Sequence, residues 1–216
     1  MNENPLRTWQ APLQAIAAAH AGDDGAHDAT HLQRVWRTAQ ELLAAHPEAD
    51  ALVVMAGCFL HDIVNLPKDH PQRAQASRLA AKAATEELSR IGFPQEKLAA
   101  VAHAVEAHSF SAAITPQTIE AQIVQDADRL DALGAVGLAR LFYTAGKMDS
   151  TLAHASDPRA QARALDDKSY ALDHIAAKLE KLPATMQTEA GRRLGAARLQ
   201  LIQAFREQFL AEWGAA

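Results

Sequence analysis

Residues 51–62 read ALVVMAGCFLHD, which is ten consecutive residues without a charged or amide side chain followed at once by a histidine and an aspartate. An apolar run of this kind predicts a helix that is buried on most of its faces. Burying an ionised carboxylate such as Asp62 costs several kcal/mol unless the carboxylate is paired or bound to a metal. We therefore expect the pair His61-Asp62 to have a partner elsewhere in the chain.

The sequence on either side of this run also favours helix. Alanine and leucine dominate, β-branched residues are few, and apolar residues recur three and four positions apart, as in AAKAATEELSRIG. Prolines, glycines and capping residues place the expected helices between Pro5 and the glycines at 22 and 25, from Asp28 or Thr30 to about His46, over 51–62, from the loop 65–71 to Arg90, from Pro94 to about His108, and over 118–138, 164–182 and 188–213. The predicted fold class is all-α.

The chain length and composition fit one compact helical bundle. With 216 residues, 49% of them hydrophobic and 22% charged, the chain can bury a sizeable core. No repeat or linker divides the sequence, so residues 1–216 are expected to form a single domain. Its core should span about 25–140, with the helices in 164–213 as scaffold.

The charge and the single cysteine exclude several classes of partner. The net charge is −5 and the positive residues are scattered, so a nucleic-acid duplex is not expected as a partner. No apolar stretch reaches the roughly 18 residues of a membrane span, and the N-terminal residues lack the pattern of a secretory signal. Cys58 alone cannot form a disulfide within the chain. We expect a cytoplasmic protein that is a monomer or a homodimer.

Three segments carry histidine and aspartate on or at the edge of a helix: HDATHLQRV at 27–35, FLHDI at 59–63 and IVQDADRLD at 123–131. Adjacent helical residues project about 100° apart, so an imidazole and a carboxylate at consecutive positions can converge on one ion beside the helix axis. A nitrogen and oxygen ligand set without sulfur suits Mn, Mg, Ni, Co, Fe or Zn. The segments therefore predict one divalent metal site.

The third segment offers several aspartates, of which Asp126 is the preferred ligand. Asp126 shares one helical stripe with three apolar residues, Ile119, Ile123 and Leu130. A carboxylate that points where apolar neighbours point calls for a cation. Asp128 is a weaker candidate, because Asp128 and Asp131 are each most simply explained as surface partners of Arg129.

These residues resemble the HD-domain superfamily of metal-dependent phosphohydrolases, whose pattern is a histidine, a histidine-aspartate pair and a distant aspartate. Here the pattern falls on His31, His61, Asp62 and Asp126. The strings HDATHLQRV, FLHDI, HSFS and QDADRLDALGAVGLAR are similar to one bacterial branch of small stand-alone HD hydrolases, and the similarity extends to the final helix. The resemblance implies an all-α domain with one divalent ion in a central cleft, held by these four residues.

The resemblance further implies hydrolysis of a phosphoester or phosphoanhydride, with a nucleotide or a similar small phosphorylated metabolite as the substrate. Cleavage of a nucleoside triphosphate to a monophosphate and pyrophosphate is one special case. Asp62, His108 and Arg34 are the expected catalytic residues. The expected substrate contacts are Arg34, Lys68, His103, His108 and Arg129. For Arg34 and Arg129, an ion pair that braces the helices explains the residue equally well.

One departure from the family pattern keeps two other functions open. Several HD hydrolases place a glutamate or aspartate shortly after the pair as a general acid or base, whereas this chain has Ile63, Val64 and Asn65. A non-catalytic nucleotide-binding sensor would need no such carboxylate. A di-iron oxygenase of the same superfamily would use two additional histidines, for which His103 and His108 supply the number but not the expected spacing.

Overall fold

The computed structural model describes residues 5–20, 29–64, 66, 75–109 and 112–214. Over these residues the protein is helical, and it contains no strand beyond an isolated bridge between Thr151 and Tyr170. The predicted all-α class is therefore confirmed. None of the helices in the described part of the chain is both long enough and apolar enough to cross a membrane.

The chain separates into two compact units, Met1–Asp128 and Arg129–Ala216. The expectation that residues 1–216 form one domain stays a prediction. The first unit contains α1 (Pro5–Ala19), α2 (Ala29–Leu43), α3 (Ala51–Leu60), α4 (Ala76–Arg90), the short 3₁₀ helix η2 (Gln95–Lys97), α5 (Leu98–Ala107) and nearly all of α6 (Ile119–Leu130). The second unit contains α7 (Gly134–Lys147), α8 (Asp173–Ala177), the 3₁₀ helix η3 (Leu179–Thr185) and α9 (Glu189–Trp213).

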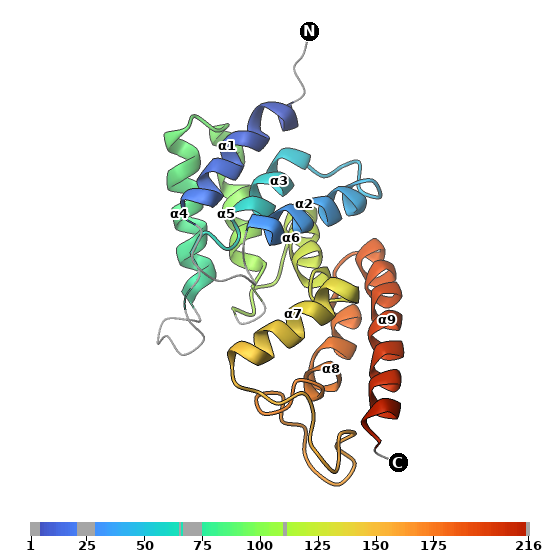
Figure 1. Cartoon of the computed structure of the whole chain (residues 1–216). Coiled ribbons are helices and arrows are strands. Elements are labelled where there is room, and N and C mark those ends of the chain that lie inside the picture. Colours follow the sequence, from blue (N-terminus) through green and yellow to red (C-terminus); the bar gives the residue numbers. More distant parts are fainter. Residues whose placement is uncertain (1–4, 21–28, 65, 67–74, 110–111, 215–216) are drawn as a thin grey trace. The chain divides into compact units, whose positions relative to one another are not determined.

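Helix α3 is the centre of the first unit, and Figure 1 shows it among α1, α2 and α5, against which it packs. Every residue from Leu52 to Leu60 is buried, as the apolar run predicts. The absence of a side chain at Gly57 allows α6 to approach, since a Cβ there would lie 2.8 Å from a methyl group of Val124. The core of this unit is thus built around the helix that ends at His61.

Asp50 begins α3 and fixes its position. Its Oδ1 accepts hydrogen bonds from the backbone N–H groups of Leu52 (3.0 Å) and Val53 (3.4 Å), and its Oδ2 pairs with the ammonium of Lys97. An aspartate in extended conformation before a helix is a favourable N-cap, because it satisfies N–H groups that have no partner within the helix. The backbone N–H of Asp50 in turn donates to Glu120 of α6 at 3.0 Å.

Replacing Asp50 with alanine is expected to lower the free energy of unfolding by about 1 kcal/mol, the usual cost of losing an N-cap. Burial raises the pKa of the Asp50 carboxyl, but Lys97 and the two backbone N–H groups lower it by more. The pKa of Asp50 is therefore below its ordinary value. The stabilisation by Asp50 is therefore present above the unfolded-state pKa of about 4 and is lost as the pH falls through the folded-state pKa. Urea unfolding at pH 7, 5 and 3 measures both effects.

Asp50→Asn is the matched control, because asparagine is an equally good N-cap but carries no charge for Lys97. Its deficit at pH 7 should be smaller than that of Asp50→Ala, and the stability difference from the wild type should shrink on acidification. A difference that grows as the pH falls would contradict the assigned direction of the Asp50 pKa.

In the second unit, α7 and η3 both pack against α9, which is drawn in red in Figure 1, and α8 packs against η3. Aromatic rings pack between α7 and α9: the ring centroid of Phe142 lies 5.6 Å from that of Phe205 and 6.3 Å from that of Phe209. Arg198 of α9 donates to the backbone carbonyl of Leu130 at 2.7 Å. These contacts pack α9 within the second unit, and its role as scaffold stays a prediction.

The prediction of one helix over 118–138 is wrong, because α6 and α7 are separated by residues 131–133. Leu133 adopts an extended conformation (φ −114°, ψ 161°), and Gly134 follows with φ +74°. That left-handed conformation suits glycine and is strained for other residues. The glycine therefore marks the point at which α7 begins as a separate helix.

The same break buries Asp131, which was expected at the surface. A Cβ on Gly137 would lie 2.2 Å from the carbonyl oxygen of Ala132, so the turn requires a glycine where α7 folds back over it. Asp131 is buried, and its Oδ2 accepts a hydrogen bond from Arg140 Nη1 at 2.7 Å. The break between the two helices thus places Arg140 of α7 beside Asp131.

The helix predicted over 164–182 is also wrong, since only α8 and η3 form there. Asp173 is buried and accepts hydrogen bonds from Arg163 and from the backbone N–H of Asp166. Asp166 in turn accepts from the N–H groups of Lys168 (3.2 Å) and Ser169 (3.1 Å). Side-chain oxygens that satisfy successive backbone N–H groups stabilise turns in competition with helix.

Candidate metal centre

The C-terminal end of α3 carries the pair that the sequence singles out. The backbone N–H of His61 continues the helix by donating to Gly57, and its ring Nδ1–H donates to the carbonyl of Cys58 at 3.0 Å. A carbonyl can only accept, so the Nε2 of a neutral His61 carries the lone pair. Cys58 is itself buried, and burial, with Asp128 nearby, raises the pKa of its thiol, as expected for an inert core cysteine.

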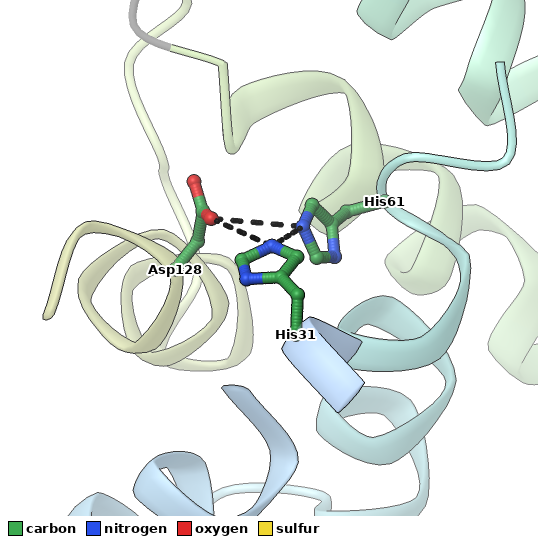
Figure 2. Close-up of side chains that lie close together, drawn as sticks. All are labelled: His31, His61 and Asp128. Atoms are coloured by element: carbon green, nitrogen blue, oxygen red, sulfur yellow. Dashed lines mark hydrogen bonds and ion pairs between the residues drawn. The ribbon is translucent and has the colours of Figure 1, made fainter. Parts of the chain in front are cut away.

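Three side chains from three parts of the first unit point toward one another in Figure 2: His31 of α2, His61 and Asp128 of α6. Nε2 of His31 lies 3.4 Å from Nε2 of His61 and 3.4 Å from Oδ1 of Asp128. The distance from that carboxylate oxygen to Nε2 of His61 is 3.7 Å. Both imidazoles are fully buried, whereas the Asp128 side chain is 27% exposed.

Asp62 and His108 border this cluster. Oδ2 of Asp62 lies 3.6 Å from Nε2 of His61 and 4.0 Å from Nε2 of His31. Its other oxygen, Oδ1, lies 3.7 Å from Nε2 of His108. The rings of His61 and His108 meet edge to face with centroids 4.8 Å apart. Asp62 therefore lies between the histidine cluster and His108.

The histidines and carboxylates of the cluster shift one another's pKa values. Burial raises the pKa of Asp62 and of Asp128, but the neighbouring histidines more than offset it and hold both pKa values below the usual range. Burial lowers the pKa of His61, yet Asp62 and Asp128 raise it above its ordinary value. Both carboxylates are thus ionised at neutral pH, and the cluster attracts positive charge.

The donor atoms fit a divalent metal ion. Nε2 of His61 presents a lone pair to oxygens of Asp62 and Asp128 at 3.6 and 3.7 Å. Two acceptors at such a distance require a proton or a cation between them. Ligand atoms that each lie about 2.1 Å from one ion are separated by up to about 4 Å, which matches the distances among these groups. A nitrogen and oxygen set without sulfur also fits the six metals considered from the sequence.

Asp128, and not the predicted ligand Asp126, is the aspartate of α6 that lies beside His31 and His61. Residues two apart on a helix project about 200° apart, so the two aspartates face opposite sides of α6. Asp126 is completely buried and is not part of the described group of three convergent ligands. The described contacts of Asp128 are with His31 and His61, so its carboxylate is not simply a surface group.

The predicted substrate contacts lie in different surroundings. His108 lies beside Asp62, as described. Nη1 of Arg34, one turn after His31 on α2, donates to Thr30 at 2.9 Å. His103 accepts from the backbone N–H of Gln117 at 2.9 Å. Nη1 of Arg129 donates to the carbonyl (2.8 Å) and hydroxyl (3.1 Å) of Thr185, which favours a bracing role.

Lys68 lies outside the described residues, as do His27 and Asn65. The roles of Arg34, His103, His108 and Arg129 toward a substrate stay predictions.

Comparisons with known proteins agree with the pattern of the cluster. The sequence model of the HD domain family matches residues 28–133. That range contains the cluster and the two residues that border it: His31, His61, Asp62, His108 and Asp128. Over 207 residues the chain is 30% identical to YpgQ of Bacillus subtilis strain 168, an uncharacterized protein, and the match covers 94% of this chain and 89% of YpgQ.

Solved structures extend the likeness to the fold. The structure of B. subtilis YpgQ in complex with ADP is 27% identical, with a TM-score of 0.72 and coverage of 94% of this chain and 97% of that one. An HD-superfamily hydrolase from Bacillus thuringiensis is 26% identical, with a TM-score of 0.73 and coverage of 97% and 99%. The sequence match, the shared fold and the histidine-aspartate cluster lead to one conclusion: the chain belongs to the HD-domain superfamily.

Proposed function

We propose that this protein is a divalent-metal-dependent phosphohydrolase that acts on a nucleotide or a similar small phosphorylated metabolite. Hydrolysis of a nucleoside triphosphate to a monophosphate and pyrophosphate is the special case to test first. The observation that carries the proposal is the convergence of His31, His61, Asp62 and Asp128, which forms a two-nitrogen, two-carboxylate site bordered by a fifth titratable group, His108.

The residues of the site divide the work between holding an ion and handling protons. His31, His61, Asp62 and Asp128 would hold the metal, and the bond from His61 Nδ1–H to Cys58 fixes that ring with Nε2 facing the site. When bound, a divalent ion lowers the pKa of water, polarises a phosphoryl oxygen and orients the two for in-line attack.

His108 is placed to hold and release a proton. Its Nδ1–H donates to the carbonyl of Val105, which leaves Nε2 directed toward Asp62 Oδ1 at 3.7 Å. The position directly after the pair is Ile63, a buried residue that cannot exchange protons. His108 therefore takes the acid or base role that a carboxylate after the pair has in other HD hydrolases.

A nucleotide substrate is supported by the relative YpgQ, which was solved in complex with ADP. Arg34, one helical turn after His31, is the phosphate contact that we favour, because its planar guanidinium can donate two parallel hydrogen bonds to a phosphoryl group. The side chain is only partly buried, so it can reach a ligand from α2.

The test is a screen of nucleoside mono-, di- and triphosphates with each of the six metals, in which phosphate and pyrophosphate are assayed separately. We expect turnover that depends on added metal, that EDTA abolishes and that Asp62→Ala lacks. Metal-dependent turnover retained in Asp62→Ala would overturn the site assignment. Nucleotide binding without turnover under any metal would favour a sensor, and two irons per chain with oxygen uptake would favour the di-iron oxygenase.

A further inference from the structure

We infer that Gln125 is a positioning residue that joins the helix of Asp128 to the turn that carries His108. This inference rests on the proposed hydrolytic function, in which His108 handles a proton. Gln125 lies in α6 and is 2% exposed. Its Nε2 donates to the backbone carbonyl of Ala107 at 2.6 Å, across 18 residues of sequence.

The acceptor of this hydrogen bond is the backbone carbonyl at the C-terminal end of α5. Ala107 is the last residue of α5, and the final carbonyls of a helix have no partner within it. His108 is the next residue, so the bond from Gln125 holds the peptide unit from which the His108 side chain departs. Because the site is buried, a carbonyl that lost this donor would have no access to water as a replacement.

The other end of the link is the metal-binding aspartate. Gln125 and Asp128 are three residues apart on α6, so they project within about 60° of each other. One helix thus directs a carboxylate at His31 and His61 and an amide at the end of α5. His108 meets Asp62 at 3.7 Å, and its ring lies 4.8 Å from that of His61. The distance from the ligand cluster to His108 therefore depends on how α5 ends against α6.

Gln125→Met tests the link, because methionine matches the length of glutamine but cannot donate a hydrogen bond. Gln122→Met is the matched control, since Gln122 lies one turn earlier on the same helix and its Nε2 donates to the carbonyl of Pro116 at 3.4 Å. We expect Gln125→Met to lower kcat by about 10-fold to 100-fold, as displacement of a reacting group by about 1 Å does, with KM unchanged. Mn²⁺ affinity, measured by titration calorimetry, should stay within about twofold, because the four ligands remain.

A double-mutant cycle separates positioning from a general structural role. In the His108→Ala background, Gln125→Met should cause no further loss of kcat, because the residue that it positions is absent. Equal loss of kcat in both backgrounds, or loss of Mn²⁺ affinity in Gln125→Met, would overturn the inference.

A readout without turnover keeps this inference separate from the proposed function. The Nδ1–H of His108, bonded to the buried carbonyl of Val105, should give a slowly exchanging imidazole resonance in ¹⁵N-labelled protein. The resonance should shift or disappear in Gln125→Met and persist in Gln122→Met, whereas an unchanged resonance in Gln125→Met would contradict the link. If the wild type hydrolyses no nucleotide, the proposed function fails while this measurement still decides whether Gln125 positions His108.

Discussion

Asp128→Asn is expected to weaken Mn²⁺ binding by more than about 100-fold, whereas Asp126→Asn should leave it nearly unchanged. The reason is geometric: Oδ1 of Asp128 lies 3.4 and 3.7 Å from the Nε2 atoms of His31 and His61, and Asp126 is not part of the convergent group. Loss of an outer partner of a metal site already costs 10-fold to 100-fold in affinity, so loss of a charged ligand should cost more. Titration calorimetry on the metal-free proteins measures the difference.

The pair of variants is matched, because each changes one carboxylate of the same helix turn into an amide of the same size. Circular dichroism and thermal unfolding of the metal-free proteins establish that both are folded before binding is compared. The opposite ranking, with Asp126→Asn losing the metal and Asp128→Asn keeping it, would restore the ligand set expected from the sequence. Equal losses in both would mean that the helix, and not one carboxylate, sets the affinity.

The two aspartates show where sequence patterns stop being informative. The rule that a carboxylate on an apolar stripe needs a cation selected Asp126, but α6 is buried on nearly all sides, so the stripe does not identify the face toward the metal. Asp128 contacts both histidines although 27% of its side chain is exposed. Partial exposure at the edge of the core is a tertiary property that one sequence does not reveal.

The histidine-aspartate pair was predictable for a different reason. The run from Ala51 to Leu60 is apolar at every position, so its burial follows from composition alone, and a charged pair at its end stands out. His31 was predicted as a metal ligand from the resemblance to the HD family pattern. Gln125 had no such signal, because a glutamine in a helix is unremarkable until the carbonyl of Ala107 is found beside its amide.

Helix breaks were harder to predict than helices. Alanine and leucine give 118–138 and 164–182 a helical pattern, and a single glycine such as Gly134 weakens such a pattern without showing where the helix ends. The stops come from groups far apart in sequence or from close backbone contacts: the left-handed Gly134 ends one pattern, and Asp173 with its partner Arg163 prevents the other. Such interactions outweigh propensities of a few tenths of a kcal/mol per residue.

Arg163→Met is expected to destabilise the second unit by about 3 kcal/mol. Asp173 is almost completely buried, and its two carboxylate oxygens accept hydrogen bonds from Arg163 Nη1 (2.5 Å) and Nη2 (2.8 Å). Removing one partner of a buried ion pair costs about 3–5 kcal/mol, because the other charge is left unpaired. We take the lower end, since Arg163 retains some solvent contact. Urea unfolding followed by hydrogen exchange of peptides from 149–185 locates the loss.

Arg159→Met is the control within the same loop, because Arg159 pairs with Glu207 at the surface (3.0 Å) and such pairs contribute about 0–1 kcal/mol. Peptides from α3 should exchange at wild-type rates in both variants. Equal destabilisation by the two arginine substitutions would show that apolar packing of the side chains, and not the ion pair, holds the loop.

The double variant Arg163→Met with Asp173→Asn decides whether the unpaired charge causes the loss. Asparagine still offers one oxygen to the backbone N–H of Asp166, which Asp173 accepts at 2.8 Å, but it leaves no buried charge without a counterion. The double variant should therefore be more stable than Arg163→Met alone, although it has lost both members of the pair. If the second substitution instead adds to the first, Asp173 stabilises the loop mainly by its hydrogen bonds. The turn around Asp166 would then be the feature that prevents a continuous helix over 164–182.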